Sequence, residues 1–303
     1  MKNRGVIPYC VIPTFLALVF AFATLSCHSA VSQITSEDQE KPTLDVPYEP
    51  SSEEVVGLML DVARVGKTDL VYDLGCGDGR VVIAAAQKRG ARGVGVDLDP
   101  ERIKESMENA RKANVANRVT FLRQDLFKTD ISKASVVMLY LWPEVNLRLR
   151  PKLLRELKPG TRVVSHSHTM GDWEADNMMM MTASEGNRVH LWVIPANVTG
   201  TWEWDRPGEK ERCVLKLGQQ FQKASGVLEW GSDEIPVNNL ELSGDRLQFS
   251  VQRPLKGQLQ TLRFSGHVQA HLIVGTEESM FGSSREKRPW KASRNPSSVK
   301  PLD

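Results

Sequence analysis

Between residues 47 and 195, short apolar runs alternate with amphipathic segments along the chain. Apolar runs bounded by turn residues are typical of buried strands, and apolar residues three and four positions apart are typical of helices. A repeated strand-helix order predicts a parallel sheet with helices on both faces. The expected strands are Leu70–Leu74, Gly93–Val96, Val119–Leu122, Val136–Leu141 and Arg162–Ser165, and the expected helices include Arg80–Lys88, Glu101–Ala113 and Leu147–Leu157.

Two helix starts carry capping residues. The segment Ser51-Ser52-Glu53-Glu54 matches a capping box, so it predicts a first helix with Ser51 as the N-cap and Glu54 at N3. Asp99 followed by Pro100 predicts the start of another helix, because an aspartate caps free N–H groups and a proline fits the first helical position.

The end of this sheet is expected to be antiparallel. Met178–Thr182 and Arg188–Ile194 predict two strands, and the turn-forming residues 184–187 between them are typical of a hairpin. The methionines at 178–181 are expected to be buried within the first of these strands.

After Pro195 the pattern changes to short strands separated by turns, with no convincing helix. The expected fold class is therefore α/β: a Rossmann-like seven-stranded sheet at 47–195, followed by an all-β small barrel or sandwich at 199–293. The polar, proline-containing residues 294–303 are expected to form a disordered tail.

The first 30 residues have the order of an export signal. Lys2 and Arg4 precede an apolar run from Phe15 to Leu25, and small residues follow. Residues 1–30 are expected to be a signal peptide or a lipoprotein leader with a lipidated Cys27, and 31–46 a polar linker. This predicts an exported protein of a bacterial envelope, either periplasmic or anchored to the membrane through the leader or Cys27. The cytoplasmic face of the membrane is the less favoured location.

Composition narrows the function classes. The chain has 303 residues, enough for two domains, and its formal net charge of +2 is spread without a basic arm, so nucleic acid is not expected as a partner. Four cysteines, two of them in the leader, do not indicate a disulfide framework. His166 and His168 could in principle share a metal, but no third ligand is spaced to join them, so no metal site is expected.

A glycine-rich turn, Asp73-Leu74-Gly75-Cys76-Gly77-Asp78-Gly79, follows the first strand. Such a turn lets the backbone approach a ligand, and the next helix offers free N–H groups to it. The glycines follow G-x-G-x-G, whereas the dinucleotide fingerprint needs a glycine where this chain has Arg80. Asp73 would repel a pyrophosphate but suits the ammonium group of S-adenosylmethionine (SAM).

Two more carboxylates follow strands of the same sheet. Asp97 ends the second strand, where it can accept hydrogen bonds from both ribose hydroxyls, and Asp125 follows the third, where it can accept from the adenine amino group. The alternative is that these acids are solvated loop residues. The expected binding residues for SAM within this sheet are Asp73, Gly75, Gly77, Asp78, Gly79, Asp97 and Asp125.

Three segments, Val71–Arg80, Gly93–Asp97 and Gln124–Phe127, resemble the first three motifs of the seven-strand (class I) SAM-dependent methyltransferases. More narrowly, residues 48–52 and Tyr140–Asn146 resemble two protein-lysine methyltransferase groups, over residues 47 to 195. These are the ATP synthase c-subunit and adenine nucleotide translocase type, and the non-SET histone-lysine type. The histone type has an asparagine pair in the fourth motif, where this chain has Leu139 and Tyr140.

The resemblance implies that Tyr48 and Glu49 flank the cofactor and that Tyr140 and Trp142 line the acceptor channel. The chain also lacks the Asn/Asp-Pro-Pro-Tyr/Phe motif of enzymes that methylate planar amines. We therefore expect a SAM-dependent protein-lysine N-methyltransferase in which Tyr48, Tyr140 and Trp142 surround the lysine amine. The alternative is an exported, non-catalytic protein that uses the same fold to bind SAM, a nucleoside or a partner.

Overall fold

The computed structural model describes residues 48–181 and 187–302. The expected leader and linker, residues 1–46, lie outside the described residues, so both stay predictions. None of the described helices has the length and apolar character needed to cross a bilayer.

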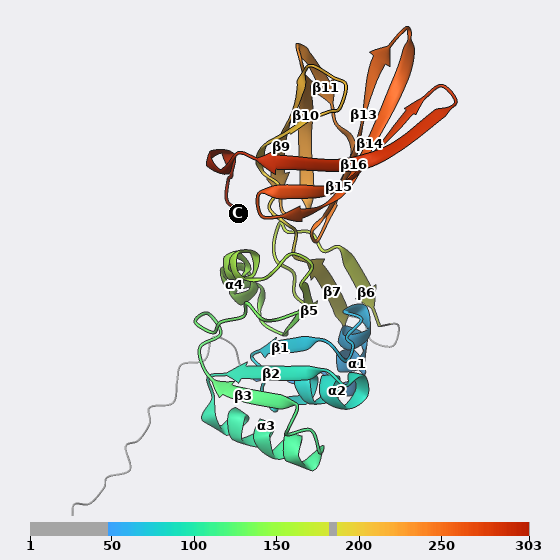
Figure 1. The fold of residues 1–303 in the computed structure, drawn as a ribbon. Coiled ribbons are helices and arrows are strands. Elements are labelled where there is room, and N and C mark those ends of the chain that lie inside the picture. Colours follow the sequence, from blue (N-terminus) through green and yellow to red (C-terminus); the bar gives the residue numbers. More distant parts are fainter. Residues whose placement is uncertain (1–47, 182–186, 303) are drawn as a thin grey trace, which may run out of the picture. The chain divides into compact units, whose positions relative to one another are not determined.

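A seven-stranded sheet forms the first part of the described chain, in the order β3-β2-β1-β4-β5-β7-β6 (Figure 1). The first five strands are parallel, and β7 runs antiparallel to both of its neighbours, β5 and β6. The predicted parallel sheet with an antiparallel end is therefore confirmed. The strands are β1 (Leu70–Leu74), β2 (Arg92–Asp97), β3 (Val119–Arg123), β4 (Val136–Leu139), β5 (Arg162–His166), β6 (Asn177–Met180) and β7 (Arg188–Val193).

Helices pack on both faces of this sheet. On one face α1, α2 and α3 bury apolar side chains against strand residues such as Val71 and Met138, and on the other α4 buries Leu149 and Leu153 against Val137. The helices are α1 (Glu53–Val62), α2 (Arg80–Arg89), α3 (Pro100–Lys112) and α4 (Pro143–Glu156). Helix α4 begins four residues earlier than expected, because Pro143 takes the first helical position.

The capping predictions had different outcomes. Asp99 caps α3 by accepting from Glu101 N at 2.8 Å, as expected. For α1 the prediction was wrong by one residue: Ser52 is the N-cap and accepts from Val55 N. Ser51 is buried and its hydroxyl contacts His166 instead.

The methionines of β6 were predicted to be buried, and this is wrong for the three that the strand contains. Met178, Met179 and Met180 are 48%, 45% and 55% exposed. The physical reason is that β6 is the edge strand, paired only with β7, and all four of its residues are exposed.

The second sheet has nine antiparallel strands in the order β11-β10-β9-β8-β16-β15-β14-β13-β12. The two edge strands, β11 and β12, are joined directly through Val237, whose N–H donates to Gly226 O. The two edges therefore lie close together, and the sheet forms a nearly closed barrel. Its interior is rich in aromatic side chains, including Trp204, Phe264 and Trp290. The strands are β8 (Gly200–Asp205), β9 (Arg212–Gln220), β10 (Lys223–Trp230), β11 (Asp233–Pro236), β12 (Asn238–Ser243), β13 (Arg246–Leu255), β14 (Gln258–Gln269), β15 (Leu272–Phe281) and β16 (Ser284–Arg294).

The expected disordered tail, 294–303, is wrong for the residues described. Arg294 is the buried last residue of β16, where its Nη1 donates to Asn197 O at 2.7 Å, and a short 3-10 helix follows at Pro296–Ser298. Lys300 N then donates to Thr199 Oγ1. The sequence did not indicate that this segment is ordered, because most residues of β16 are polar and lie on its outer face. Trp290, Ala292 and Arg294 point inward.

Candidate active site

The glycine loop joins β1 to α2 and is shaped by its backbone. Gly75 N and Cys76 N both donate to Val96 O, which ties the loop to β2. Gly77 and Gly79 have positive φ angles of 51° and 79°, and a Cβ on Gly77 would lie 2.3 Å from the ring of Tyr48. These two glycines therefore let the loop turn and let Tyr48 approach; neither lines the pocket beside it.

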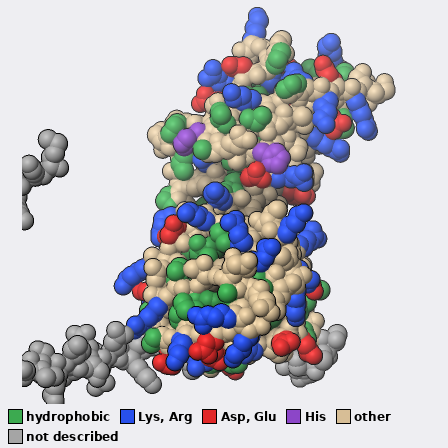
Figure 2. Space-filling view, turned by 60° about the horizontal axis from the view of Figure 1, so that its bottom comes forward, with side chains coloured by type: hydrophobic (Ala, Val, Ile, Leu, Met, Phe, Trp, Pro, Cys, Tyr) green, Lys and Arg blue, Asp and Glu red, His purple; other side chains and the backbone are tan. Residues whose placement is uncertain are grey.

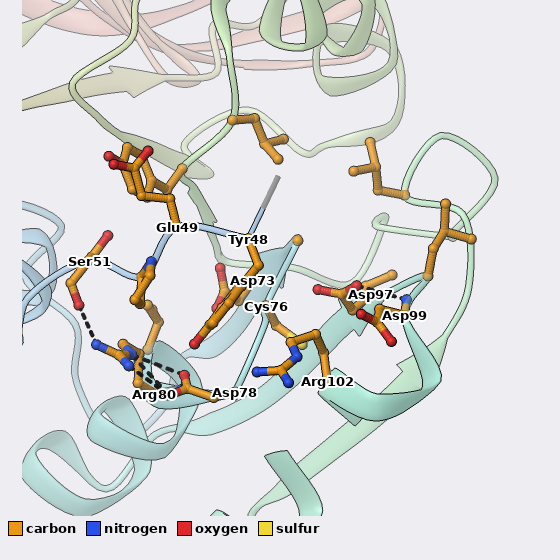
Figure 3. A pocket seen from close by; sticks show the side chains of 18 of the residues that line it. Tyr48, Glu49, Ser51, Asp73, Cys76, Asp78, Arg80, Asp97, Asp99 and Arg102 are labelled. Atoms are coloured by element: carbon orange, nitrogen blue, oxygen red, sulfur yellow. Dashed lines mark hydrogen bonds and ion pairs between the residues drawn. The ribbon is translucent and has the colours of Figure 1, made fainter. Parts of the chain in front are cut away.

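A pocket lies at the carboxyl ends of β1, β2 and β4 (Figure 3). This is where open α/β sheets bind their ligands. Seven of the residues predicted for the site line it: Tyr48, Glu49, Asp73, Gly75, Asp78, Asp97 and Tyr140. Residues that the sequence had not singled out for the site include Ser51, Arg80, Asp99, Arg102, Gln124 and Leu126.

Asp73 is 5% exposed at the base of this pocket. Burial, and then the nearby carboxylates of Asp97 and Asp78, raise the pKa of Asp73 well above its ordinary value. Among the described residues no group donates a hydrogen bond to its carboxylate. A buried acid without a partner is costly, so this position suits a ligand that brings a positive charge.

Two further pocket carboxylates, Asp97 and Asp78, hold the backbone of the glycine loop and its neighbours. Asp97 accepts from Gly77 N at 2.9 Å and from Asp99 N at 3.0 Å, so it fixes both the glycine loop and the start of α3. Asp78 pairs with Arg80 at 2.7 Å. Burial alone would raise the pKa of Asp78, but its hydrogen bonds with Arg80 outweigh burial and lower it. Asp73, Asp78, Asp97 and the glycine loop together form what we call the cofactor side.

Residues 48–51, which we call the strap, cross the glycine loop and form one wall of the pocket. The Tyr48 ring rests on Gly77, and the guanidinium of Arg102 stacks over that ring at 4.8 Å. Arg80 Nη1 donates to Ser51 O at 2.8 Å (Figure 3). The strap is thus attached to the cofactor side at two points.

Opposite these carboxylates, Glu49, Tyr140, His166 and His168 form what we call the acceptor side. The ring of Tyr140, just after β4, lies 4.0 Å from that of His166 and 6.1 Å from that of His168, centre to centre. Ser167 between the histidines has a positive φ of 61°, a turn that lets both rings face Tyr140. Burial, and then the Glu49 carboxylate, raise the pKa of Tyr140.

Besides Gly77 and Gly79, two predicted site residues lie outside the pocket lining. Trp142 is 49% exposed and starts α4 outside the pocket lining. Asp125 points into its own loop, where it accepts from Phe127 N at 2.8 Å and pairs with Lys128. The neighbours of Asp125, Gln124 and Leu126, line the pocket in its place. The described residues contain no group of three or more acids, histidines or cysteines that could hold a metal.

Comparisons with known proteins identify the family of the domain that contains this pocket. A family model described as the ANTKMT methyltransferase domain matches residues 73–177, from the base of the pocket to β6. A protein-lysine N-methyltransferase from Saccharolobus islandicus is 44% identical over 151 residues, which are 49% of this chain and 94% of that relative. The chain belongs to the ANTKMT methyltransferase family.

Two further relatives of this methyltransferase cover similar lengths. The ATP synthase c-subunit lysine N-methyltransferase of Xenopus laevis is 30% identical over 177 residues, 58% of this chain and 73% of that relative. A solved RNA methyltransferase from Salinibacter ruber, in complex with S-adenosyl-L-homocysteine, is 46% identical, with a TM-score of 0.48. It covers 53% of this chain and 98% of its own. The family match ends before the second sheet begins.

The methyltransferase is an enzyme that uses SAM. The residues of the pocket fit this cofactor, because the buried and unpaired Asp73 can neutralise its ammonium group and Asp97 has oxygen lone pairs left for ribose hydroxyls. SAM would supply an activated methyl group when bound.

Proposed function

We propose that this methyltransferase transfers the methyl group of SAM to a lysine amine of a protein. The observation that carries the proposal is the acceptor side, where Tyr140 and the strap carboxylate Glu49 meet at the edge of the cofactor pocket. The names of the relatives from Saccharolobus islandicus and Xenopus laevis, both lysine N-methyltransferases, support it.

A lysine ammonium must lose a proton before its nitrogen can attack. From a pKa of about 10.4, that loss costs about 4.6 kcal/mol at pH 7. Glu49 attracts the incoming ammonium, and the half-buried ring of Tyr140 desolvates it. Desolvation lowers the pKa of the lysine, so its proton is released to solvent before the attack. The nitrogen lone pair then forms the N–C bond as the C–S bond breaks, and S-adenosylhomocysteine leaves.

Methyl-labelled SAM tests the proposal directly. The purified protein is incubated with labelled SAM and an envelope extract, and the labelled peptides are sequenced, with the Asp97→Ala variant as the background control. We expect label on lysine side chains that is absent with the variant. Label only on carboxylates, hydroxyls, RNA or small molecules would contradict the proposal.

We also propose that the protein is exported, on the order of charges and apolar residues in residues 1–30. Cell fractionation with N-terminal mass spectrometry should find a mature chain that starts between about residues 27 and 31 outside the cytoplasmic membrane. A full-length soluble chain in the cytoplasm would contradict it.

A further inference from the structure

One buried contact joins the strap to the far side of the active site and has no part in the reaction described above. Ser51 Oγ lies 2.9 Å from His166 Nδ1, although the two residues are 115 positions apart in the sequence. His166 is 4% exposed at the end of β5. This contact attaches the strap to the acceptor side, as Arg80 attaches it to the cofactor side.

The hydrogen bonds of His166 define which nitrogen carries the proton. His166 Nε2 lies 3.3 Å from Asn187 Oδ1, and a carboxamide oxygen can only accept, so Nε2 carries the hydrogen. In the neutral ring Nδ1 is then an acceptor, and the Ser51 hydroxyl donates to it. Burial, and then the neighbouring His168, lower the pKa of His166, which agrees with a neutral ring.

The same ring contacts Tyr140 at 4.0 Å, tilted by 34°. His166 is therefore in contact with the strap through Nδ1 and with the acceptor-side aromatic ring through its face. With both nitrogens partnered and almost no exposed surface, it is not placed to touch the acceptor or to take its proton.

We propose that His166 is a positioning residue, whose hydrogen bond with Ser51 sets the strap and Tyr140 at a fixed separation. The inference rests on the proposed function, because the group positioned is the wall that receives the lysine. Breaking the bond leaves the strap joined to the acceptor side only through Glu49 beside Tyr140, while Arg80 and the Tyr48–Gly77 contact still hold it to the cofactor side.

Adjacent serines provide a matched pair of variants. Ser51→Ala removes the hydroxyl that meets His166, whereas Ser52→Ala removes only the N-cap of α1. The chain has four tyrosines, so full-length protein grown with 3-fluorotyrosine gives four assignable fluorine signals, and the Tyr140 signal needs no acceptor to be read. We expect Ser51→Ala to shift or broaden the Tyr140 signal, Ser51→Thr to restore it, and Ser52→Ala to leave it in place.

Kinetics on the lysine peptide from the labelling experiment give the second readout. Ser51→Ala should lower kcat/KM for that peptide about tenfold, a loss of about 1.4 kcal/mol, while the Kd for SAM changes less than about threefold. The combination of Ser51→Ala with His166→Gln should cost little more than either change alone, because both remove one bond. His190→Gln, at a similarly buried histidine on β7, controls for loss of a buried imidazole.

The outcomes separate this inference from the proposed function. A Tyr140 signal that responds equally to Ser51→Ala and Ser52→Ala, or losses that multiply in the double variant, would overturn the positioning role. A Tyr140 response specific to Ser51 in a protein that labels no lysine would remove the lysine assignment and support the positioning role.

Discussion

The cofactor side and the acceptor side are built in different ways. The cofactor side draws its carboxylates from the glycine loop and the ends of β1 and β2, within residues 73–97. Backbone N–H groups hold Asp97, Arg80 holds Asp78, and Asp73 has no donor among the described residues. The acceptor side collects Glu49, Tyr140, His166 and His168 from three segments that are far apart in the sequence, and fixes them through side-chain contacts.

Changes on the two sides are therefore expected to affect different steps. Changes on the cofactor side should alter the Kd for SAM, and changes on the acceptor side should alter kcat/KM for the acceptor. On the face of the molecule shown in Figure 2, Lys and Arg side chains are scattered among Asp and Glu side chains and do not form a single charged patch.

Asp97→Ala should have the largest effect. It removes a carboxylate expected to bind the ribose and also frees the N–H groups of Gly77 and Asp99, so SAM binding should weaken by about 3 kcal/mol, or about 150-fold. Calorimetry on the folded variant measures this loss. Asp125→Ala is the matched control and should change the Kd less than about twofold, because Asp125 lies outside the pocket lining.

Asp73→Asn should weaken SAM binding about 30-fold and yet stabilise the ligand-free protein. Burial raises the pKa of Asp73 in the folded chain above its pKa in the unfolded chain. The free energy of unfolding therefore falls as pH rises from the unfolded-state pKa toward the folded-state pKa. Asparagine keeps the shape without the charge, so the Tm of the ligand-free variant at pH 7 should exceed that of the parent. A lower Tm together with unchanged SAM affinity would show that Asp73 is structural.

Tyr140→Phe tests the other half of the comparison. Loss of the hydroxyl beside Glu49 should lower kcat/KM for the lysine acceptor about fivefold, with SAM affinity unchanged. Tyr72→Phe, a change at the buried tyrosine of β1, should leave both parameters near parent values. An equal loss of SAM affinity in Tyr140→Phe would mean that the two sides cannot be separated.

The smallest effect concerns pH. Burial lowers the pKa of both His166 and His190 in the folded chain, so the unfolded chain binds protons more readily. The free energy of unfolding should therefore fall as pH drops below about 6.5. Denaturant melts at several pH values should show a shallower fall for His166→Gln, and an unchanged slope would exclude His166 as a contributor.

The cofactor side could be predicted from the sequence more fully than the acceptor side. Asp73, Asp97 and the glycine loop were predictable because strand ends and a G-x-G-x-G turn place them within one local unit. The sequence could not show that Asp125 turns into its own loop, because position at a strand end does not determine where a side chain points. Ser51 was assigned to a helix cap, since adjacent serines are equivalent in the sequence and only the contact with His166 distinguishes them.

In the second sheet too, contacts between distant residues could not be predicted from the sequence. Short apolar runs separated by turns predicted an all-β unit, but the closing of its edges at Val237 and the ordered strand β16 depend on partners distant in the chain. Arg102 left no signal at all, because its contact with Tyr48 exists only once α3 has packed beside the strap.

A crystal structure of the protein with S-adenosylhomocysteine would show how the ligand lies between the two sides. We expect the ammonium group beside Asp73, the ribose hydroxyls on Asp97 and the sulfur directed toward Tyr140. A ligand that contacts Asp125 in place of Asp97, or whose sulfur faces away from Tyr140, would contradict the assignment of the two sides.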